Sequence, residues 1–407
     1  MALTHIPKPI LPIPPSWFPG HMMKFTRMLP TLLTRTDVVL EIRDSRLPLT
    51  SINRTLEGAL RKWRNERGWD PNHPGRRIMA TEACEHIVVL NKRDLVPEWG
   101  MEPFTNAMAK KFPHQRLLFA SWQRPKDIRT LSDLLVSITK QHPHAMELNV
   151  LVIGMPNVGK STLLNALRNT GIKGRTPKAF QTSANPGMTQ ALSTRLKVSL
   201  DPLVYAFDTP GVMLPFLGRG AEGAERGVKL ALIAGIKEGL YDMEALALYL
   251  LYRLNVLNPI SPAYLRILPS GSSPTTDLDE FLTLLAQRMG MMKRGAELDT
   301  SRAAVYFVRW WREEGGLIAA NEALQLDASA SHGTQGWGFD FQWDVQPSEL
   351  SGRELVQQKM ELSIDEYVAS TDQEEHDENN VSDTQKKKQL VMEEKKRRRE
   401  RYAAKRG

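Results

Sequence analysis

The sequence is poor in cysteine and in long apolar runs. Cys84 is the single cysteine among 407 residues, which excludes an internal disulfide framework and a cysteine-based metal site. No apolar run reaches the ~20 residues that a bilayer-spanning helix needs, and the best candidate, residues 243–257, is interrupted by Glu244 and Arg253. We therefore expect no transmembrane segment, and a reducing compartment or one whose redox state is irrelevant.

Acidic residues are missing from the first 36 positions, whereas Lys8, Lys24, Arg27 and Arg35 lie there. This charge bias is typical of a mitochondrial presequence. Residues 6–15, however, are too rich in proline to form the amphipathic helix of such a presequence. Residues 1–23 are therefore interpreted as an N-terminal arm that either carries a targeting segment or lies extended on the folded body.

Positive charge is concentrated at the C-terminal end. Residues 386–407 contain eleven Lys or Arg and three Glu, which equals the net charge of +8 of the whole chain. Such a block neutralises phosphates and is typical of RNA-binding or nuclear-targeting segments, although a solvated charge run has the same composition. Residues 323–407 as a whole are predicted to be a disordered linker, acidic stretch and basic tail.

Short β-branched runs that end in polar loops alternate with helical patterns over residues 24–224. This alternation predicts an α/β fold with a mostly parallel sheet, whose ligands bind at the carboxyl ends of the strands. The pattern becomes helical over residues 225–322, which predicts a smaller all-helical domain. The expected strands lie within residues 37–44, 86–94, 116–121, 149–156 and 203–211.

A phosphate-binding loop is the most specific local signal. Residues 154–161 match G-x-x-x-x-G-K-[ST] between an apolar run and a helical pattern, which is the context that the motif requires. Lys160 is expected to reach the β- and γ-phosphates, and the Ser161 hydroxyl to ligate Mg²⁺. The expected phosphate contacts are Gly154, Asn157, Val158, Gly159, Lys160, Ser161 and Thr162.

Two later motifs fit the same chemistry. In DTPG (208–211), Asp208 is expected to hold Mg²⁺ and the Gly211 amide to meet the γ-phosphate. In NPGMTQ (185–190), Thr189 is expected to contact Mg²⁺ only when the γ-phosphate is present. Thr176 and Thr182 are nearby candidates for the same role.

The tetrapeptide NKRD (91–94) indicates a guanine site. The Asp94 carboxylate can accept hydrogen bonds from the two donors on one edge of guanine, a pair that adenine does not present. Asn91 is expected to contact the ring and its supporting loops, the stem of Lys92 to pack over the base, and Arg93 to belong to the same site.

NKRD precedes the phosphate loop, whereas most GTP-binding domains have the opposite order. Motifs on loops at one edge of a sheet converge whatever their order, and the termini of a compact domain are often close enough to be joined and reopened elsewhere. The order of base motif, phosphate loop, switch threonine and DTPG therefore predicts a circularly permuted P-loop GTPase domain.

Over residues 16–320 the sequence resembles the circularly permuted GTPases of ribosome assembly, and within them the mitochondrial ribosome-associated GTPase 1 family. The resemblance rests on SWFPGHMMK, DVVLEIRDSRLPLTSIN, VLNKRDLV, GMPNVGKSTLLNALR, NPGMTQ, DTPGVMLP and RAAVYFVRWWREEGGL. It implies a GTPase that assists assembly of the mitochondrial large ribosomal subunit and contacts its rRNA, as a peripheral protein on the matrix side of the inner membrane.

Signalling GTPases carry a glutamine after DxxG to orient the attacking water, and Val212 occupies that position here. An aliphatic side chain cannot orient water, so another group has to do so. The resemblance points to His21 as a catalytic residue and to a K⁺ ion held partly by Asn157. Ser121 stands where the family has its base-side SA-type loop.

Three other functions compete with this interpretation. A trafficking or signalling GTPase shares the fold but is expected to keep the uninterrupted motif order and the glutamine. An RNA-binding protein with a vestigial or regulatory nucleotide site disagrees with the intact phosphate and magnesium residues. A nucleolar or cytosolic ribosome-assembly GTPase differs only in its compartment.

Overall fold

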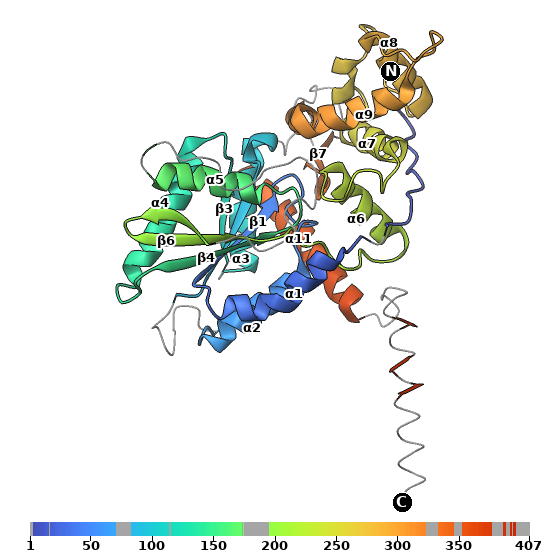
Figure 1. Cartoon of the computed structure of the whole chain (residues 1–407). Helices are drawn as coiled ribbons and strands as arrows, with labels where there is room; N and C mark the ends of the chain where they lie inside the picture. The colour runs from blue at the N-terminus through green and yellow to red at the C-terminus, as the bar shows by residue number, and fades with distance from the viewer. Residues whose placement is uncertain are drawn as a thin grey trace, which may run out of the picture.

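The computed structural model describes residues 3–15, 17–70, 83–113, 115–172, 174, 195–322, 333–345 and 352–376, with short pieces at 386–387, 391–392 and 394–395. A sheet domain and a mostly helical part lie side by side (Figure 1). The proline-rich arm is extended along the helical part, where the Leu3 amide donates to the Pro259 carbonyl at 3.0 Å and Lys8 pairs with Glu225 at 3.1 Å. The arm thus lies on the folded body, while its role in targeting stays a prediction.

Six strands form one sheet in the order β3-β2-β1-β4-β6-β5. All neighbours are parallel except β5, which pairs antiparallel with β6 at the edge. The central strands are rich in Val, Ile and Leu because helices cover both of their faces. The strands are β1 (Val38–Asp44), β2 (Glu85–Asn91), β3 (Arg116–Ala120), β4 (Leu148–Gly154), β5 (Leu196–Leu200) and β6 (Leu203–Asp208).

Helices cover the sheet in two layers (Figure 1). On one face, α1 (Gly20–Leu33) and α2 (Arg54–Glu66) pack against Val39, Leu151 and Ile153, with α3 (Glu98–Lys111) beside them. The opposite face is covered by α4 (Pro125–Gln141) and α5 (Lys160–Gly171).

The permuted order of the motifs is explained by the sheet. Strand β4, which carries the phosphate loop, lies between β1 and β6, and the base motif follows β2 on the far side of β1. These strands are parallel, so their carboxyl ends lie at one edge of the sheet. The circularly permuted α/β fold that the sequence predicts is confirmed.

The helical part begins with α6 (Gly220–Leu232), so the domain boundary expected at residue 225 falls inside this helix. Three of its later helices start at aspartate caps: Asp242, Asp277 and Asp299 each accept hydrogen bonds from backbone amides two or three residues on. The remaining elements are α7 (Met243–Leu257), η2 (Ala263–Ile267), α8 (Leu278–Met289), α9 (Thr300–Trp310), the π-helical η3 (Trp311–Gly315) and α10 (Gly316–Glu322).

The expectation of disorder after residue 322 is wrong for two segments. A hairpin, β7 (Gly333–Trp337) and β8 (Phe341–Val345), is followed by α11 (Arg353–His376), which packs along α3. Trp337 is 1% exposed, and its indole nitrogen donates to the Ser45 carbonyl at 2.9 Å. The sequence signal that was missed is the alternation of large apolar and polar residues over 341–345, which is typical of a strand such as β8, whereas residues 333–336 carry no such pattern.

None of the helices in the described ranges combines the length and the apolar character needed to cross a bilayer.

Candidate nucleotide-binding site

The phosphate loop joins β4 to α5 and is held in a shape that requires glycine at two positions. Gly154 has φ +147°, and a Cβ there would lie 2.2 Å from the Ile42 carbonyl oxygen. Gly159 has φ +91°, and its Cβ would lie 2.4 Å from Asn91 Nδ2. Any larger residue at either position would therefore displace β1 or the base motif.

Lys160 lies inside the loop. Its Nζ donates to the carbonyl oxygens of Met155 and Gly154, at 2.9 and 3.3 Å. Burial lowers the pKa of its ammonium group to about 8, although the nearby Asp208 carboxylate opposes this shift. A bound phosphate would replace these two neutral carbonyl acceptors of Lys160 with anionic oxygens. It would therefore stabilise the charged form of the lysine.

Ser161 and Asp208 come together from α5 and the end of β6. Ser161 Oγ donates to Asp208 Oδ2 at 2.5 Å. Burial raises the pKa of the Asp208 carboxyl, and Lys160 and the Ser161 hydrogen bond partly offset this rise. A hydroxyl and a carboxylate oxygen side by side fit Mg²⁺, which prefers hard oxygen ligands.

DTPG packs directly on the phosphate loop. A Cβ on Gly211 would lie 2.6 Å from the backbone nitrogen of Pro156, and the Val212 amide donates to the Gly154 carbonyl at 3.1 Å. The Val212 side chain is 1% exposed and packs in the core cluster that contains Phe25. It is therefore fixed in the hydrophobic core and cannot replace the water-orienting glutamine of signalling GTPases.

The base motif is tied to the phosphate loop. Asn91 Nδ2 donates to the Val158 carbonyl at 2.8 Å, and Lys92 Nζ donates to the Asn157 carbonyl at 2.8 Å. Asp94 is half-buried in the short helix η1 (Arg93–Leu95), and none of the described residues donates a hydrogen bond to its carboxylate. The Asp94 carboxylate, which the sequence predicts to read the base, therefore keeps its acceptor positions for a ligand.

Asp127 is a site residue that sequence reasoning missed. Its carboxylate accepts from Arg93 Nη1 at 3.0 Å and from the Ser121 amide at 3.1 Å. Asp127 thus joins NKRD to the loop after β3. The Arg93 guanidinium is bound to this carboxylate and is not directed towards a base. Contacts of Arg93 and Ser121 with GTP stay predictions.

Asp44 was missed as well. Its buried carboxylate accepts from Lys92 Nζ at 2.8 Å and from Arg46 Nε and Nη2 at 2.9 and 2.7 Å. These two cations hold its pKa well below the usual range, although burial acts in the opposite direction. Its position at the end of β1, on the same sheet edge as both motifs, is the sequence signal that could have identified it.

Comparisons with known proteins agree with this geometry. Residues 149–253 match the family described as "50S ribosome-binding GTPase". A mitochondrial ribosome-associated GTPase 1 from Xenopus tropicalis is 31% identical over 68% of this chain and 81% of its own length. A mitochondrial GTPase 1 from Schizosaccharomyces japonicus is also 31% identical, over 73% of this chain and 87% of its own. The chain belongs to the mitochondrial ribosome-associated GTPase 1 family.

Among solved structures, GNP-bound YlqF from T. maritima covers 71% of this chain and 94% of its own at 20% identity, with a TM-score of 0.42.

In this member of the family, His21 is the second residue of α1, and burial lowers the pKa of its imidazole. Its Nε2 is buried and has no hydrogen-bond partner within the described ranges. The next residue, Met22, accepts a hydrogen bond from the Met213 amide through its sulfur at 3.5 Å. The start of α1 therefore contacts the loop that follows DTPG. Thr189, with its competitors Thr176 and Thr182, lies outside the described residues.

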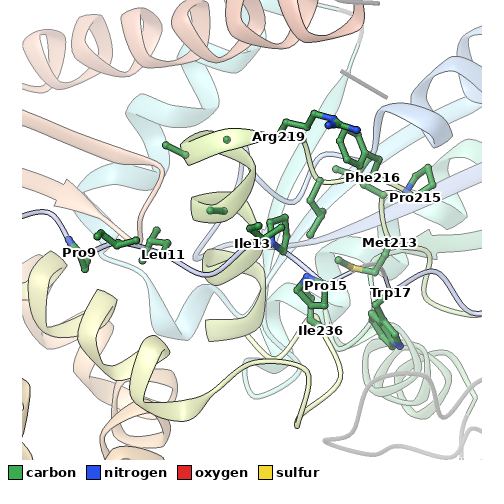
Figure 2. Close-up of a pocket in the computed structure, with 18 of the residues that line it drawn as sticks. Pro9, Leu11, Ile13, Pro15, Trp17, Met213, Pro215, Phe216, Arg219 and Ile236 are labelled. Atoms are coloured by element: carbon green, nitrogen blue, oxygen red, sulfur yellow. The ribbon is translucent and has the colours of Figure 1, made fainter. Parts of the chain in front are cut away.

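A cavity of about 930 Å³ lies beside that loop, between the N-terminal arm and residues 213–221 (Figure 2). Trp17 and Ile13 line it from the arm, and Met213 and Phe216 from the loop. No phosphate-loop residue lines it, so this cavity is separate from the nucleotide site.

Proposed function

We propose that the protein hydrolyses GTP to GDP and phosphate and thereby assists assembly of the mitochondrial large ribosomal subunit, and so mitochondrial translation. The relatives named as mitochondrial and ribosome-associated support this proposal. In it, the protein acts on the matrix side of the inner membrane as a peripheral protein that contacts large-subunit rRNA.

The observation that carries the proposal is the meeting of three separate motifs at one sheet edge. Lys160 supplies charge for the phosphates, Ser161 and Asp208 lie 2.5 Å apart, and Asn91 and Lys92 hold the base motif on the phosphate loop. The phosphates, the magnesium ion and the base differ in charge and hydrogen bonding, and each of them has a matching group here. A vestigial site is not expected to keep all three.

Ser161, Asp208 and Thr189 would hold Mg²⁺, and Asn157 would help to hold K⁺. Bound there, these cations would neutralise charge that develops on the phosphates. The protein itself binds the nucleotide, keeps Val212 in the core, and places the start of α1 beside the loop after DTPG. His21 would orient the water that attacks the γ-phosphorus while the bond to the β-phosphate oxygen breaks.

Nucleotide state would be communicated to the helical part. The Arg312 guanidinium donates to the carbonyls of Leu232 and Ala231 at 2.6 and 3.0 Å, at the end of α6. Arg46, which holds Asp44, donates to the Arg312 carbonyl at 3.2 Å. In this proposal GTP favours the ribosome-bound form and hydrolysis releases the protein. Equal affinity of the GTP-analogue and GDP forms for the subunit would contradict it.

The test is GTP hydrolysis in potassium and in sodium buffer, with and without purified large mitoribosomal subunits, beside Lys160→Ala. The expected result is stimulation by both potassium and subunits that the variant loses. A rate unaffected by subunits removes the ribosome as activator, and lack of GTP binding favours the regulatory RNA-binding alternative. Imaging of the tagged protein separates mitochondria from nucleolus and cytosol.

A further inference from the structure

The outward faces of α1 and α2 form a cationic surface. The exposed cations are Lys24 and Arg27 of α1, Arg35 just beyond the end of α1, and Arg61 and Lys62 of α2. Lys62 lies 3.8 Å from Glu66, whereas none of the other four has a carboxylate partner within the described ranges. The surface, which we name the α1–α2 face, therefore has an excess of positive charge.

The α1–α2 face is rigid because its inner side belongs to the core. Phe25, Leu29 and Leu33 of α1 pack with Leu56 and Leu60 of α2 in one buried cluster, and the two helices lie side by side (Figure 1). Lys24 and Arg27 lie about one turn apart on α1, and Arg61 and Lys62 are adjacent in α2, so the cations come from both helices. The positive charges are thus held on a fixed platform of two helices, and charge attraction requires a partner with several negative charges.

We propose that the α1–α2 face docks on the phosphate backbone of double-helical RNA. This inference rests on the proposed ribosomal function and assigns a surface to it. Lys and Arg on a folded face bind phosphates without reading sequence. The described side chains of α1 and α2 include no exposed aromatic ring on which single-stranded bases could stack, so a duplex backbone is the better match.

An anionic membrane is the other partner that such charge could suit. A helix that lies in a membrane interface buries a large apolar face in lipid. The large apolar residues of α1 are already buried in the core, and its exposed apolar side chains Met23 and Met28 are each 40% exposed. Little apolar surface remains to insert, so the face favours RNA.

RNA docked on the α1–α2 face would influence the nucleotide site, because α1 connects this face to the loop after DTPG. Its outward face carries Lys24 and Arg27, and its first turn carries His21 and Met22, whose sulfur contacts the Met213 amide. RNA bound to the outer side of α1 would therefore hold the same helix whose first turn lies against the loop after DTPG.

The test uses the full-length protein and a 20-base-pair double-stranded RNA of arbitrary sequence, titrated over a range of salt concentrations. The variant K24E/R27E/R61E is compared with K126E/R129E/K140E, which reverses three exposed charges on α4, across the sheet. All proteins keep the basic tail, so its contribution cancels. We expect the α1–α2 variant to bind at least about tenfold more weakly, with a salt slope smaller by about 2 to 3, and the α4 variant to bind like wild type.

Equal binding by the α1–α2 variant and wild type would overturn the inference, as would an equal loss in the α4 variant. Binding to single-stranded RNA and binding to vesicles with anionic lipid are measured in parallel. The inference is also overturned if the wild-type protein binds either of these partners more tightly than the duplex and the α1–α2 variant loses that binding. GTP affinity and basal hydrolysis are measured on every protein. Normal GTP hydrolysis without duplex binding contradicts only this inference, whereas absent GTP binding contradicts the proposed function.

Discussion

Asn157 Nδ2 donates a hydrogen bond to the carbonyl oxygen of Ala234, and the two atoms lie 2.9 Å apart. Asn157 is in the phosphate loop, and Ala234 is in the turn that follows α6; both have positive φ, 58° and 60°. Non-glycine residues adopt this conformation only when their surroundings hold them there. The phosphate loop is therefore joined directly to the helical part.

Substituting Asn157 tests its two assigned roles separately. Asn157→Ala removes both the donor to Ala234 and the oxygen proposed for K⁺, so we expect potassium stimulation of GTP hydrolysis to fall by at least about tenfold. Asn157→Asp keeps an oxygen but loses the donor, and should retain stimulation. Rates in potassium and sodium buffers measure this. Full stimulation in the alanine variant would remove Asn157 from the cation site.

Asp94→Asn should change base preference. The amide presents a donor where the carboxylate accepts, so one hydrogen bond from guanine is lost and the other weakened. We expect GDP to bind at least about 100-fold more weakly, and the xanthine nucleotide, which has a carbonyl at this edge, to bind better than to wild type. Asp133→Asn, at an exposed position in α4, is the matched control. Unchanged selectivity would place the base elsewhere.

GTP affinity should depend on pH through Lys160. Burial lowers its pKa to about 8 in the free protein, and the anionic phosphates of GTP raise it on binding. Below pH 8 the lysine is charged in both states, and above it binding has to take up a proton. The dissociation constant should therefore rise between pH 8 and 9, by up to about tenfold. Calorimetric titrations at several pH values measure this rise.

Lys160→Arg separates this lysine from other titrating groups, because arginine stays charged over the whole range. Any pH dependence left in that variant belongs to the guanine base or to other residues. An identical dependence in wild type and variant would show that Lys160 is not the titrating group.

The sequence predicts those parts of the site whose signal is local. The loop at 154–161 and DTPG carry their geometry in a few adjacent residues, and both meet as expected. Asp44 and Asp127 are different, because each pairs with a cation of the base motif that only the fold brings to it, Lys92 for Asp44 and Arg93 for Asp127. The position of Asp44 at the end of a strand marks it as a candidate, but spacing along the chain does not reveal these pairings.

The hairpin at 333–345 was missed for another reason. Its composition, rich in Gly, Asp and Gln, resembles a linker, whereas the alternation of its aromatic residues predicts strands. The average composition of a window of residues does not depend on their order, so it cannot show that apolar and polar residues alternate with a period of two. Its aromatic side also needs a partner: Phe104 and Phe119 lie 5.6 and 6.2 Å, ring to ring, from Trp337, and they come from elements more than 200 residues earlier.

Trp337→Ala should therefore destabilise the sheet domain. The indole is 1% exposed and donates to the Ser45 carbonyl, so its removal leaves a cavity and a buried acceptor without a partner. We expect the free energy of unfolding to fall by about 3–5 kcal/mol in urea denaturation. Trp122→Ala, at a position that is 53% exposed, is the same substitution without burial. Equal stability of both variants would mean that the hairpin does not support the domain.

His21→Gln should lower the rate of hydrolysis but not the affinity for GTP. His21 lies at the start of α1, beside the loop that follows DTPG, and Val212 cannot orient water, so we expect kcat to fall by about 100-fold with an unchanged dissociation constant. Burial lowers the histidine pKa below 6.5. Wild-type hydrolysis should therefore persist at neutral pH and decline only on further acidification, when the ring becomes charged. His144→Gln, at an exposed position, controls for loss of a histidine. A normal rate in His21→Gln would assign the attacking water to another group.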